Sequence, residues 1–242
     1  MNNVAFAYAL MAHILLDFYL QNDKMAQDKE QSVPVLVLHC ALYALGIAIL
    51  VGSVYELNFL DVSVSAVIVF SSHLLIDGPL RHLARNRGVN EAMRFAVDQA
   101  LHVFVLLALL IVSNASAGYS LQSMKVRTAI AWALSIMCCW KPAAIAVSMI
   151  LCSARAANNG ESEEHGPKSG RWIGILERML VLALSMLGEY SAIAFVFTAK
   201  SIARFKEIER DRDFAEVYLL GTLSSVAIAL FSVLLAKSVA GI

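Results

Sequence analysis

The stretch VPVLVLHCALYALGIAILVGSV, residues 33–54, decides the class of fold. It contains no Asp, Glu, Lys or Arg, and a helix that spans a membrane needs about 20 consecutive, mainly apolar residues. Six further apolar runs lie along the chain, at 3–20, 60–80, 93–113, 126–153, 173–199 and 214–236. These long runs do not alternate with polar residues, so they predict an all-α, polytopic transmembrane helix bundle of about seven spans and not a β-barrel.

The composition of the 242-residue chain points the same way. Apolar residues make up 59 % and charged residues 16 %, whereas soluble domains carry about 25 % charged residues. This composition excludes an ordinary soluble enzyme, a disordered chain and a nucleic-acid-binding protein. Nineteen basic and nineteen acidic residues balance, so the net charge selects no partner and the expected environment is the lipid bilayer.

Polar connections divide the chain into a front region, 1–113, and a back region, 126–242. The front region is predicted as a four-span bundle that holds five of the six histidines. The back region is predicted as three spans, with a charged segment at 200–213 that lies at the membrane interface as a helix. A Trp-Lys-Pro sequence at 140–142 interrupts the run 126–153, which is either one kinked span or a re-entrant pair.

The distribution of basic residues gives only a weak orientation. Seven simple crossings place seven basic residues on one side of the membrane and ten on the other. A re-entrant hairpin at 126–153 changes the split to eleven against six. Because basic residues accumulate in cytoplasmic connections, the second arrangement is favoured and its basic side is predicted to be cytoplasmic.

The front region contains an internal repeat of two helix hairpins. In each hairpin an HxxxD motif closes the first span, and a single histidine follows in the second span. The residues are His13, Asp17 and His39 in the first hairpin and His73, Asp77 and His102 in the second. This duplication predicts two hairpins related by an axis near the membrane normal, a symmetry that is also found in transporters.

Seven ionisable groups inside these four spans are expected to form one cluster. Three His/Asp pairs have members four residues apart, so each pair shares a helix face. The pairs are His13 with Asp17, His73 with Asp77 and Asp98 with His102, and His39 is the seventh group. Because odd and even spans run in opposite directions, all seven fall within about 15 Å of one membrane face. Each group costs at least about 2.5–3.5 kcal/mol to insert, so the cluster needs mutual compensation or a cation.

The donor types in this cluster favour a divalent metal centre. Imidazole nitrogens and carboxylate oxygens bind zinc or manganese. The predicted ligands of one or two such ions are His13, Asp17, His73, Asp77, Asp98 and His102. Asp98 or His39 is then the candidate general base. Three alternatives stay open: His/Asp hydrogen bonds that only hold helices together, a proton or ion pathway, and a bis-histidine haem between His39 and His102.

Basic residues border the same leaflet. Lys24, Arg81 and Arg85 lie in the connections next to the cluster, where they could bind an anionic lipid headgroup or a lipid-linked phosphate. Lys200 and Arg204, one turn apart in the back region, could also hold a phosphate, although ion pairs within 200–213 are the default interpretation. Part of this basic charge is also expected to set the orientation in the membrane.

Several stretches of the chain resemble a known family. They are AHILLDFYLQ (12–21) with Lys24, Met25, Ala26 and His39, SHLLID (72–77), DQALH (98–102), ERML (177–180), AKSIARF (199–205) and FAEVYLLGT (214–222). Together they resemble the bacterial domain-of-unknown-function family 3307. This resemblance implies a multi-pass protein of the bacterial inner membrane, and it brings no settled activity. SHLLID is also similar to the SHxxxD segment of membrane-bound metal-dependent hydrolases, which implies His73 and Asp77 as metal ligands.

These patterns lead to one main expectation and two competing ones. The leading expectation is a membrane-embedded metal-dependent hydrolase that acts on a lipid-linked or phosphorylated substrate. The duplicated hairpin favours a cation or proton transporter instead, and a structural or partner-binding membrane protein is the third hypothesis. Placement of the whole cluster in one leaflet favours the enzyme, because a transporter site is expected near the bilayer midplane.

Overall fold

The computed structural model describes residues 3–52, 59–112, 123–159 and 168–241. Within these ranges every regular element is helical, which confirms the all-α prediction. Predicted span residues 53, 54 and 113 lie outside the described residues. The chain forms two compact units: Met1–Met137 with Ala236–Ile242, and Cys138–Leu235.

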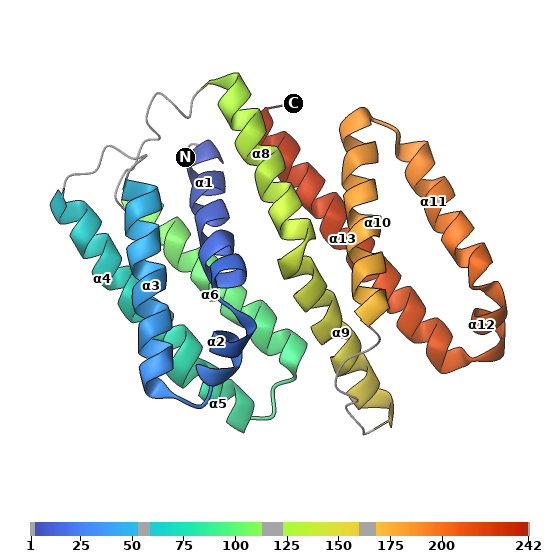
Figure 1. Ribbon diagram of the computed structural model, residues 1–242, viewed down its shortest axis with the longest axis horizontal. Helices are drawn as coiled ribbons and strands as arrows, with labels where there is room; N and C mark the ends of the chain where they lie inside the picture. Colours follow the sequence, from blue (N-terminus) through green and yellow to red (C-terminus); the bar gives the residue numbers. More distant parts are fainter. Residues whose placement is uncertain (1–2, 53–58, 113–122, 160–167, 242) are drawn as a thin grey trace. The chain divides into compact units, whose positions relative to one another are not determined.

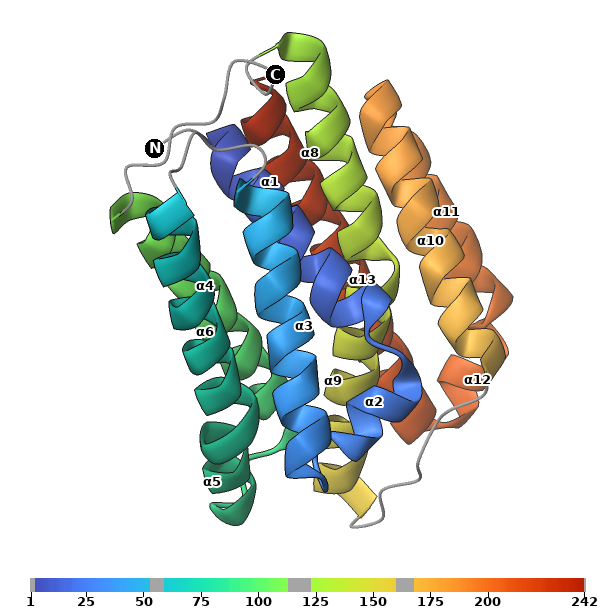
Figure 2. The same ribbon diagram turned by 60° about the vertical axis from the view of Figure 1, so that its left-hand side comes forward.

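The first unit is built around four helical segments that match the predicted front spans (Figures 1 and 2). Its elements are α1 (Asn3–Ile14) with η1 (Leu15–Leu20), α2 (Asp23–Asp28), α3 (Val33–Gly52), α4 (Phe59–Leu75) with η2 (Ile76–Leu80) and α5 (Arg81–Asn86), α6 (Glu91–Val112), and most of α8 (Met124–Cys139). α1 packs on α3 and α6, and α4 packs on the same two helices. The four therefore close into one bundle.

The two halves of the repeat share a local distortion. α1 runs directly into the π-helical turn η1, and α4 runs directly into the π-helical turn η2. Asp17 lies on η1 and Asp77 lies on η2. In η2, Pro79 has no N–H to continue a regular ladder. A π turn is wider than an α turn and is often found at functional sites, so both motif aspartates are rotated away from their regular α-helical positions.

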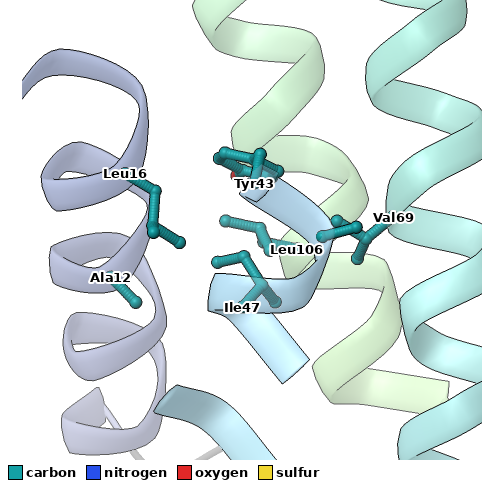
Figure 3. Packing of buried hydrophobic residues seen from close by; sticks show 7 residues of the cluster. Ala12, Leu16, Tyr43, Ile47, Val69 and Leu106 are labelled. Carbon is teal, nitrogen blue, oxygen red and sulfur yellow. The ribbon is translucent and has the colours of Figure 1, made fainter. Parts of the chain in front are cut away.

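Apolar side chains fill the centre of this bundle beside the polar cluster. Figure 3 shows Ala12 and Leu16 turned toward residues of the three neighbouring helices. The buried cluster consists of Ala12, Leu16, Tyr43, Ala44, Ile47, Val69 and Leu106. Gly46 allows a close approach here, because a Cβ atom at this position would collide with the Leu16 side chain. Small residues commonly permit such contacts between membrane helices.

Large apolar side chains also cover the outside of the helices. Leu45 and Ile49 on α3 are 58 % and 59 % exposed, and Val67 on α4 is 65 % exposed. Five helices are long and apolar enough to cross a bilayer: Val33–Gly52, Phe59–Asn86, Glu91–Val112, Met124–Arg155 and Arg212–Ala240. Val4–Leu20 and Tyr190–Ala203 are shorter apolar helices. An apolar exterior on long helices indicates a membrane protein.

The second unit corrects the prediction of a single span at 173–199. It contains α9 (Lys141–Asn159), α10 (Lys168–Leu187), α11 (Tyr190–Ala203), α12 (Phe205–Arg210) and most of α13 (Arg212–Ala240). α10 ends because Gly188 adopts a φ of +78°, a left-handed conformation that glycine tolerates and that commonly ends helices. α11 then packs back against α10 (Figure 2). The predicted sixth span is therefore a helical hairpin.

Two other features of the back region are settled by local geometry. Only Trp140 separates α8 from α9, and the Ala144 amide bonds to the Trp140 carbonyl at 3.2 Å. Met124–Arg155 is thus one apolar helical run, which agrees with a kinked span and not with a re-entrant pair. The segment 200–213, predicted as one interfacial helix, is interrupted at Arg204 and Asp211.

The hairpin changes the expected orientation in the membrane. If α10 and α11 enter the bilayer as one hairpin, both ends of the hairpin are expected on one side of the membrane. Thirteen basic residues then share a side: Lys24, Lys29, Arg81, Arg85, Arg87, Arg94, Arg155, Lys168, Arg171, Arg204, Lys206, Arg210 and Arg212. Only Lys125, Arg127 and Lys237 lie near the opposite side. We therefore expect the side with thirteen to be cytoplasmic.

Single cysteines introduced at Asn86, Ser201 and Ser123 test this topology in a background without reactive native cysteines. An impermeant maleimide added to intact cells should leave Asn86→Cys and Ser201→Cys unlabelled until the membrane is opened. Ser123→Cys should react from outside. Labelling of the first two positions from opposite sides would contradict the hairpin arrangement.

Candidate metal centre

Four side chains from both halves of the repeat converge inside the first bundle. Asp17 and Asp77 come from the two π turns, His39 comes from α3, and His73 lies in the last turn of α4. One donor atom from each of these residues lies within 4.8 Å of every other. We call Asp17, His39, His73 and Asp77 the first ligand group.

The spacing of these donor atoms suits a tetrahedral metal ion. His39 Nε2 lies 3.0 Å from His73 Nε2 and 3.3 Å from Asp17 Oδ1. Asp77 Oδ2 lies 3.5 Å from His39 Nε2 and 3.6 Å from His73 Nε2. Bonds of about 2.0–2.1 Å to a tetrahedral zinc ion place neighbouring donors roughly 3.3 Å apart. The group therefore has both the donor types and the spacing of a metal site.

Asp77 also belongs to a second ligand group, formed with Asp98 and His102 of α6. Asp77 Oδ1 lies 3.8 Å from His102 Nε2, while Asp77 Oδ2 faces the first ligand group. The two oxygens of one carboxylate thus point toward two sets of donors. A carboxylate placed in this way can bridge two metal ions, which lie about 3.5–4 Å apart in two-metal sites.

Several buried polar atoms of the two groups have no hydrogen-bond partner among the described residues. They are Asp17 Oδ1, His73 Nδ1, Asp98 Oδ1 and His102 Nε2. Buried polar atoms are nearly always hydrogen-bonded, and each exception needs an explanation. The explanation offered by the donor set is a cation, because Asp17 Oδ1 and His102 Nε2 lie 3.3 Å and 3.8 Å from other donor atoms of the two ligand groups.

His13 does not belong to either ligand group, although the sequence predicted it as a metal ligand. Its Nε2 donates to Gln99 Oε1 at 3.1 Å, and its Nδ1 lies 2.8 Å from the Tyr43 hydroxyl. The Gln99 amide nitrogen in turn lies 3.0 Å from Asp98 Oδ2 and 3.4 Å from Asp17 Oδ2. Gln99 and His13 therefore orient carboxylates of both groups, as outer residues of metal sites do. Sequence reasoning missed Gln99 and Tyr43, because neither is ionised near neutral pH.

The ring contacts exclude the haem alternative. The His73 ring lies 5.0 Å from the His39 ring and 4.3 Å from the His102 ring, measured between centroids. The Tyr43 ring stacks on His73 at 4.0 Å. Because His73 contacts both histidines that would ligate the iron, a porphyrin has no room between them.

Lys29 is a further residue of the site that the sequence did not predict. Its ammonium lies 2.6 Å from Asp77 Oδ2 and 3.4 Å from His39 Nε2, and its side chain is only 8 % exposed. A lysine in a short connection is normally solvated, so nothing in the sequence indicated that this side chain is buried. It reaches the cluster because the connection after η1 folds back through α2, whose first turn is capped by Asn22.

The predicted anion-binding residues have different surroundings. Arg81 Nη2 lies 2.9 Å from Glu30 Oε1, and Arg85 Nη1 lies 3.9 Å from Glu30 Oε2. Both arginines are partly exposed, and Lys24 on α2 is exposed. The basic border of the site is therefore partly neutralised by one glutamate of the same chain.

Lys200 and Arg204 belong to the second unit. Lys200 donates to Glu177 Oε2 at 2.8 Å and to Thr222 Oγ1 at 3.1 Å. Arg204 pairs with Glu207 at 3.8 Å. Arg204 thus has an ion pair within 200–213, as the default interpretation expects, whereas the partner of Lys200 lies on α10. The phosphate site at these two residues stays a prediction.

Fold and site define an all-α protein with membrane-type helices and a buried His/Asp cluster inside its first four-helix bundle. The chain belongs to the family described as protein of unknown function (DUF3307), whose model matches residues 5–130. The matched range contains both ligand groups, Lys29 and Glu30. The similar stretches of the back region lie outside it. No curated protein and no solved structure matches the chain, so the similarity to membrane-bound metal-dependent hydrolases gains no support from these comparisons.

Proposed function

We propose that the protein is a metal-dependent hydrolase of the bacterial inner membrane that acts on a lipid-linked or phosphorylated substrate. The observation that carries this proposal is Asp77, one buried carboxylate shared by two ligand groups. A bound divalent ion, zinc or manganese, supplies positive charge that polarises a phosphoryl oxygen and makes a water molecule more acidic.

Each residue of the cluster has a definite task in this proposal. The first ligand group holds one ion, and Asp77 with Asp98 and His102 holds a second. Gln99 fixes Asp17 and Asp98 through its amide nitrogen. Asp98 is the general base, because its side chain is 11 % exposed and is the most accessible carboxylate of the two groups. His39 serves as a ligand and not as the base.

The border of the site explains why the substrate is expected to be anionic. Arg81 and Arg85 lie on α5, directly after the π turn that carries Asp77. Guanidinium groups bind phosphate through paired hydrogen bonds. A substrate with an apolar tail in the leaflet would bring its phosphate to these arginines, next to the metal centre.

A cation transporter is the second candidate, and Lys29 is the observation that favours it. An ammonium that pairs with a ligand carboxylate can exchange with a transported cation. The repeated hairpins support the same idea. Flux of manganese into vesicles that contain the purified protein, without release of phosphate from a lipid, would favour transport over hydrolysis.

Metal analysis of the detergent-purified protein tests the proposal. The wild type should bind up to two equivalents of zinc or manganese, and His73→Ala should lose most of the bound ion because it removes a donor of the first ligand group. His82→Ala is the matched control: this histidine lies on exposed α5 and contacts only Arg85 and Asn86 among the described hydrogen bonds. Equal metal content in His73→Ala and wild type, or no bound metal in the wild type, would contradict the proposal.

Activity is measured on the same preparations with vesicles of phosphatidic acid as the probe. Asp98→Asn should keep the ion of the first ligand group and lose phosphate release by at least 100-fold, because it removes both a donor of the second ion and a general base, and positioned general bases alone contribute about 10²–10⁴-fold. Full activity of Asp98→Asn would remove Asp98 from the mechanism.

A further inference from the structure

The connection between η1 and α3, residues 21–32, carries two neighbouring charges that point in opposite directions. Lys29 reaches inward to Asp77 at 2.6 Å. Glu30 reaches outward to Arg81 at 2.9 Å and to Arg85 at 3.9 Å. We call residues 21–32 the strap. It is held to the segment that contains η2 and α5 by one buried ion pair and two partly exposed ones.

The inner contact of the strap has the chemistry of a bound cation. The Lys29 ammonium lies within hydrogen-bond distance of Asp77 Oδ2 and His39 Nε2. Both atoms are donors of the first ligand group. A divalent ion at the same donors would meet the positive charge of Lys29 at close range. The two cations therefore compete for one place, since like charges repel strongly in a buried site.

The outer contact of the strap has the chemistry of a bound anion. The two carboxylate oxygens of Glu30 divide between two arginines, with Oε1 on Arg81 and Oε2 on Arg85. A phosphate offers the same arrangement of two oxygens with more charge, and arginine recognises both groups in the same way. Glu30 thus occupies the donors that an anionic headgroup would use.

We propose that the strap is an internal substitute for the ligands of this site, with Lys29 in place of a divalent cation and Glu30 in place of an anionic phosphate group. This inference rests on the proposed function and adds its regulation. The cation and the anion each release one end of the same short connection. Binding of either one therefore makes binding of the other easier, as linkage requires for two ligands that favour one open state.

The two ends of the strap differ in strength, which gives the order of opening. The side chains of Arg81 and Arg85, which pair with Glu30, are 31 % and 49 % exposed. Exposed ion pairs contribute little stability. The Lys29 pair is buried at both partners, so it holds more firmly unless a new cation compensates Asp77. The anion is expected to displace Glu30 first, and the cation then replaces Lys29.

Two variants of the full-length, detergent-purified protein test the two ends separately. Lys29→Met keeps an apolar stem and removes the competing charge, so its affinity for manganese should rise at least 10-fold. Glu30→Gln keeps the shape and weakens the hold on both arginines, so binding of the anion should rise several-fold. Lys125→Met is the matched control, because Lys125 is an exposed lysine on α8 of the same unit and lies outside the strap. It should leave both affinities unchanged.

The anion has two possible sources, which the probes separate. Inorganic phosphate and vesicles with phosphatidylglycerol are each titrated with and without manganese. A lipid source predicts that manganese strengthens binding to the vesicles only, whereas a free phosphate source predicts that it strengthens phosphate binding only. Independence of manganese and both anions would overturn the proposed coupling.

A labelling experiment keeps both ion pairs intact and covers the case in which Lys29→Met does not fold. Met25 on the strap is half-buried, so Met25→Cys should react faster with a maleimide when manganese and the anion are added together. An unchanged rate overturns the strap proposal. Failure of the proposed function is distinguishable: the wild type then binds no metal at all, whereas failure of the strap alone leaves metal binding that still depends on His73.

Discussion

Replacing Asp77 with alanine is expected to abolish metal binding at both ligand groups and to lower the free energy of unfolding of the first unit by about 3–5 kcal/mol. Asp77 belongs to both groups and is the counter-ion of Lys29, and its side chain is only 1 % exposed. Its removal leaves the buried Lys29 ammonium without the carboxylate that lies 2.6 Å away and balances its charge. Breaking a buried pair at one member costs more than the pair contributes in the folded state.

A second variant separates the stability effect from the metal effect. Asp77→Ala combined with Lys29→Met removes both charges, so most of the lost stability should return while metal binding stays absent. Glu91→Gln, an exposed carboxylate at the start of α6, is the control for acidic side chains of the same bundle. Thermal unfolding in detergent measures the effect on stability, and metal analysis measures the effect on metal binding. A wild-type Tm in Asp77→Ala, with metal retained, would show that Asp77 is neither a ligand nor the partner of Lys29.

Much of the fold follows from the length and polarity of the apolar runs. The predicted run 3–20 coincides with α1 and η1, and the run 33–54 begins where α3 begins. Hydropathy averages over many residues, so it merged α10 and α11 across a turn of only two residues. The local signal was Gly188 next to Glu189, a glycine followed by a charge within an apolar run. A helix end depends on such single residues and not on the average of a window.

The cluster itself was predictable, but the task of each member was not. The distance of each residue from the end of its span predicted that His73, Asp77, Asp98 and His102 lie in one layer. The structure places them in contact. The wide π turns rotate the motif aspartates, and regular helical spacing does not include that rotation. His13 lies in the outer network, where it contacts Tyr43 and Gln99. The path of the short connection 21–32 does not follow from any periodicity of the sequence. The contact between Lys29 and the cluster could therefore not be predicted.

The second large effect is expected at Arg178 in the second unit. This side chain is only 2 % exposed. It donates from Nε to the Cys139 carbonyl at 2.7 Å and from Nη1 to Ser225 Oγ at 2.9 Å. The Cys139 carbonyl lies at the end of α8, beside the interruption before Pro142, where the regular helical ladder is broken. Arg178 therefore caps a helix end inside the protein.

Arg178→Ala should lower the free energy of unfolding of the second unit by about 3 kcal/mol. Two hydrogen bonds from a charged donor contribute about 1.5–3 kcal/mol each, and loss of a buried stem leaves a cavity. Removal of the buried charge also removes the cost of taking it out of water, which offsets only part of the loss. Arg178→Lys keeps the charge but not the planar fork, so it should lose less than alanine does.

Thermal unfolding in detergent measures these losses, with Arg171→Ala, an exposed arginine on the same helix, as the control. Every ligand of the proposed metal centre lies in the first unit. Folded Arg178→Ala protein should therefore bind as much metal as the wild type, even though it melts at a lower temperature. Loss of metal from folded Arg178→Ala protein would mean that the second unit takes part in the centre, and the ligand assignment would then have to include residues of the back region.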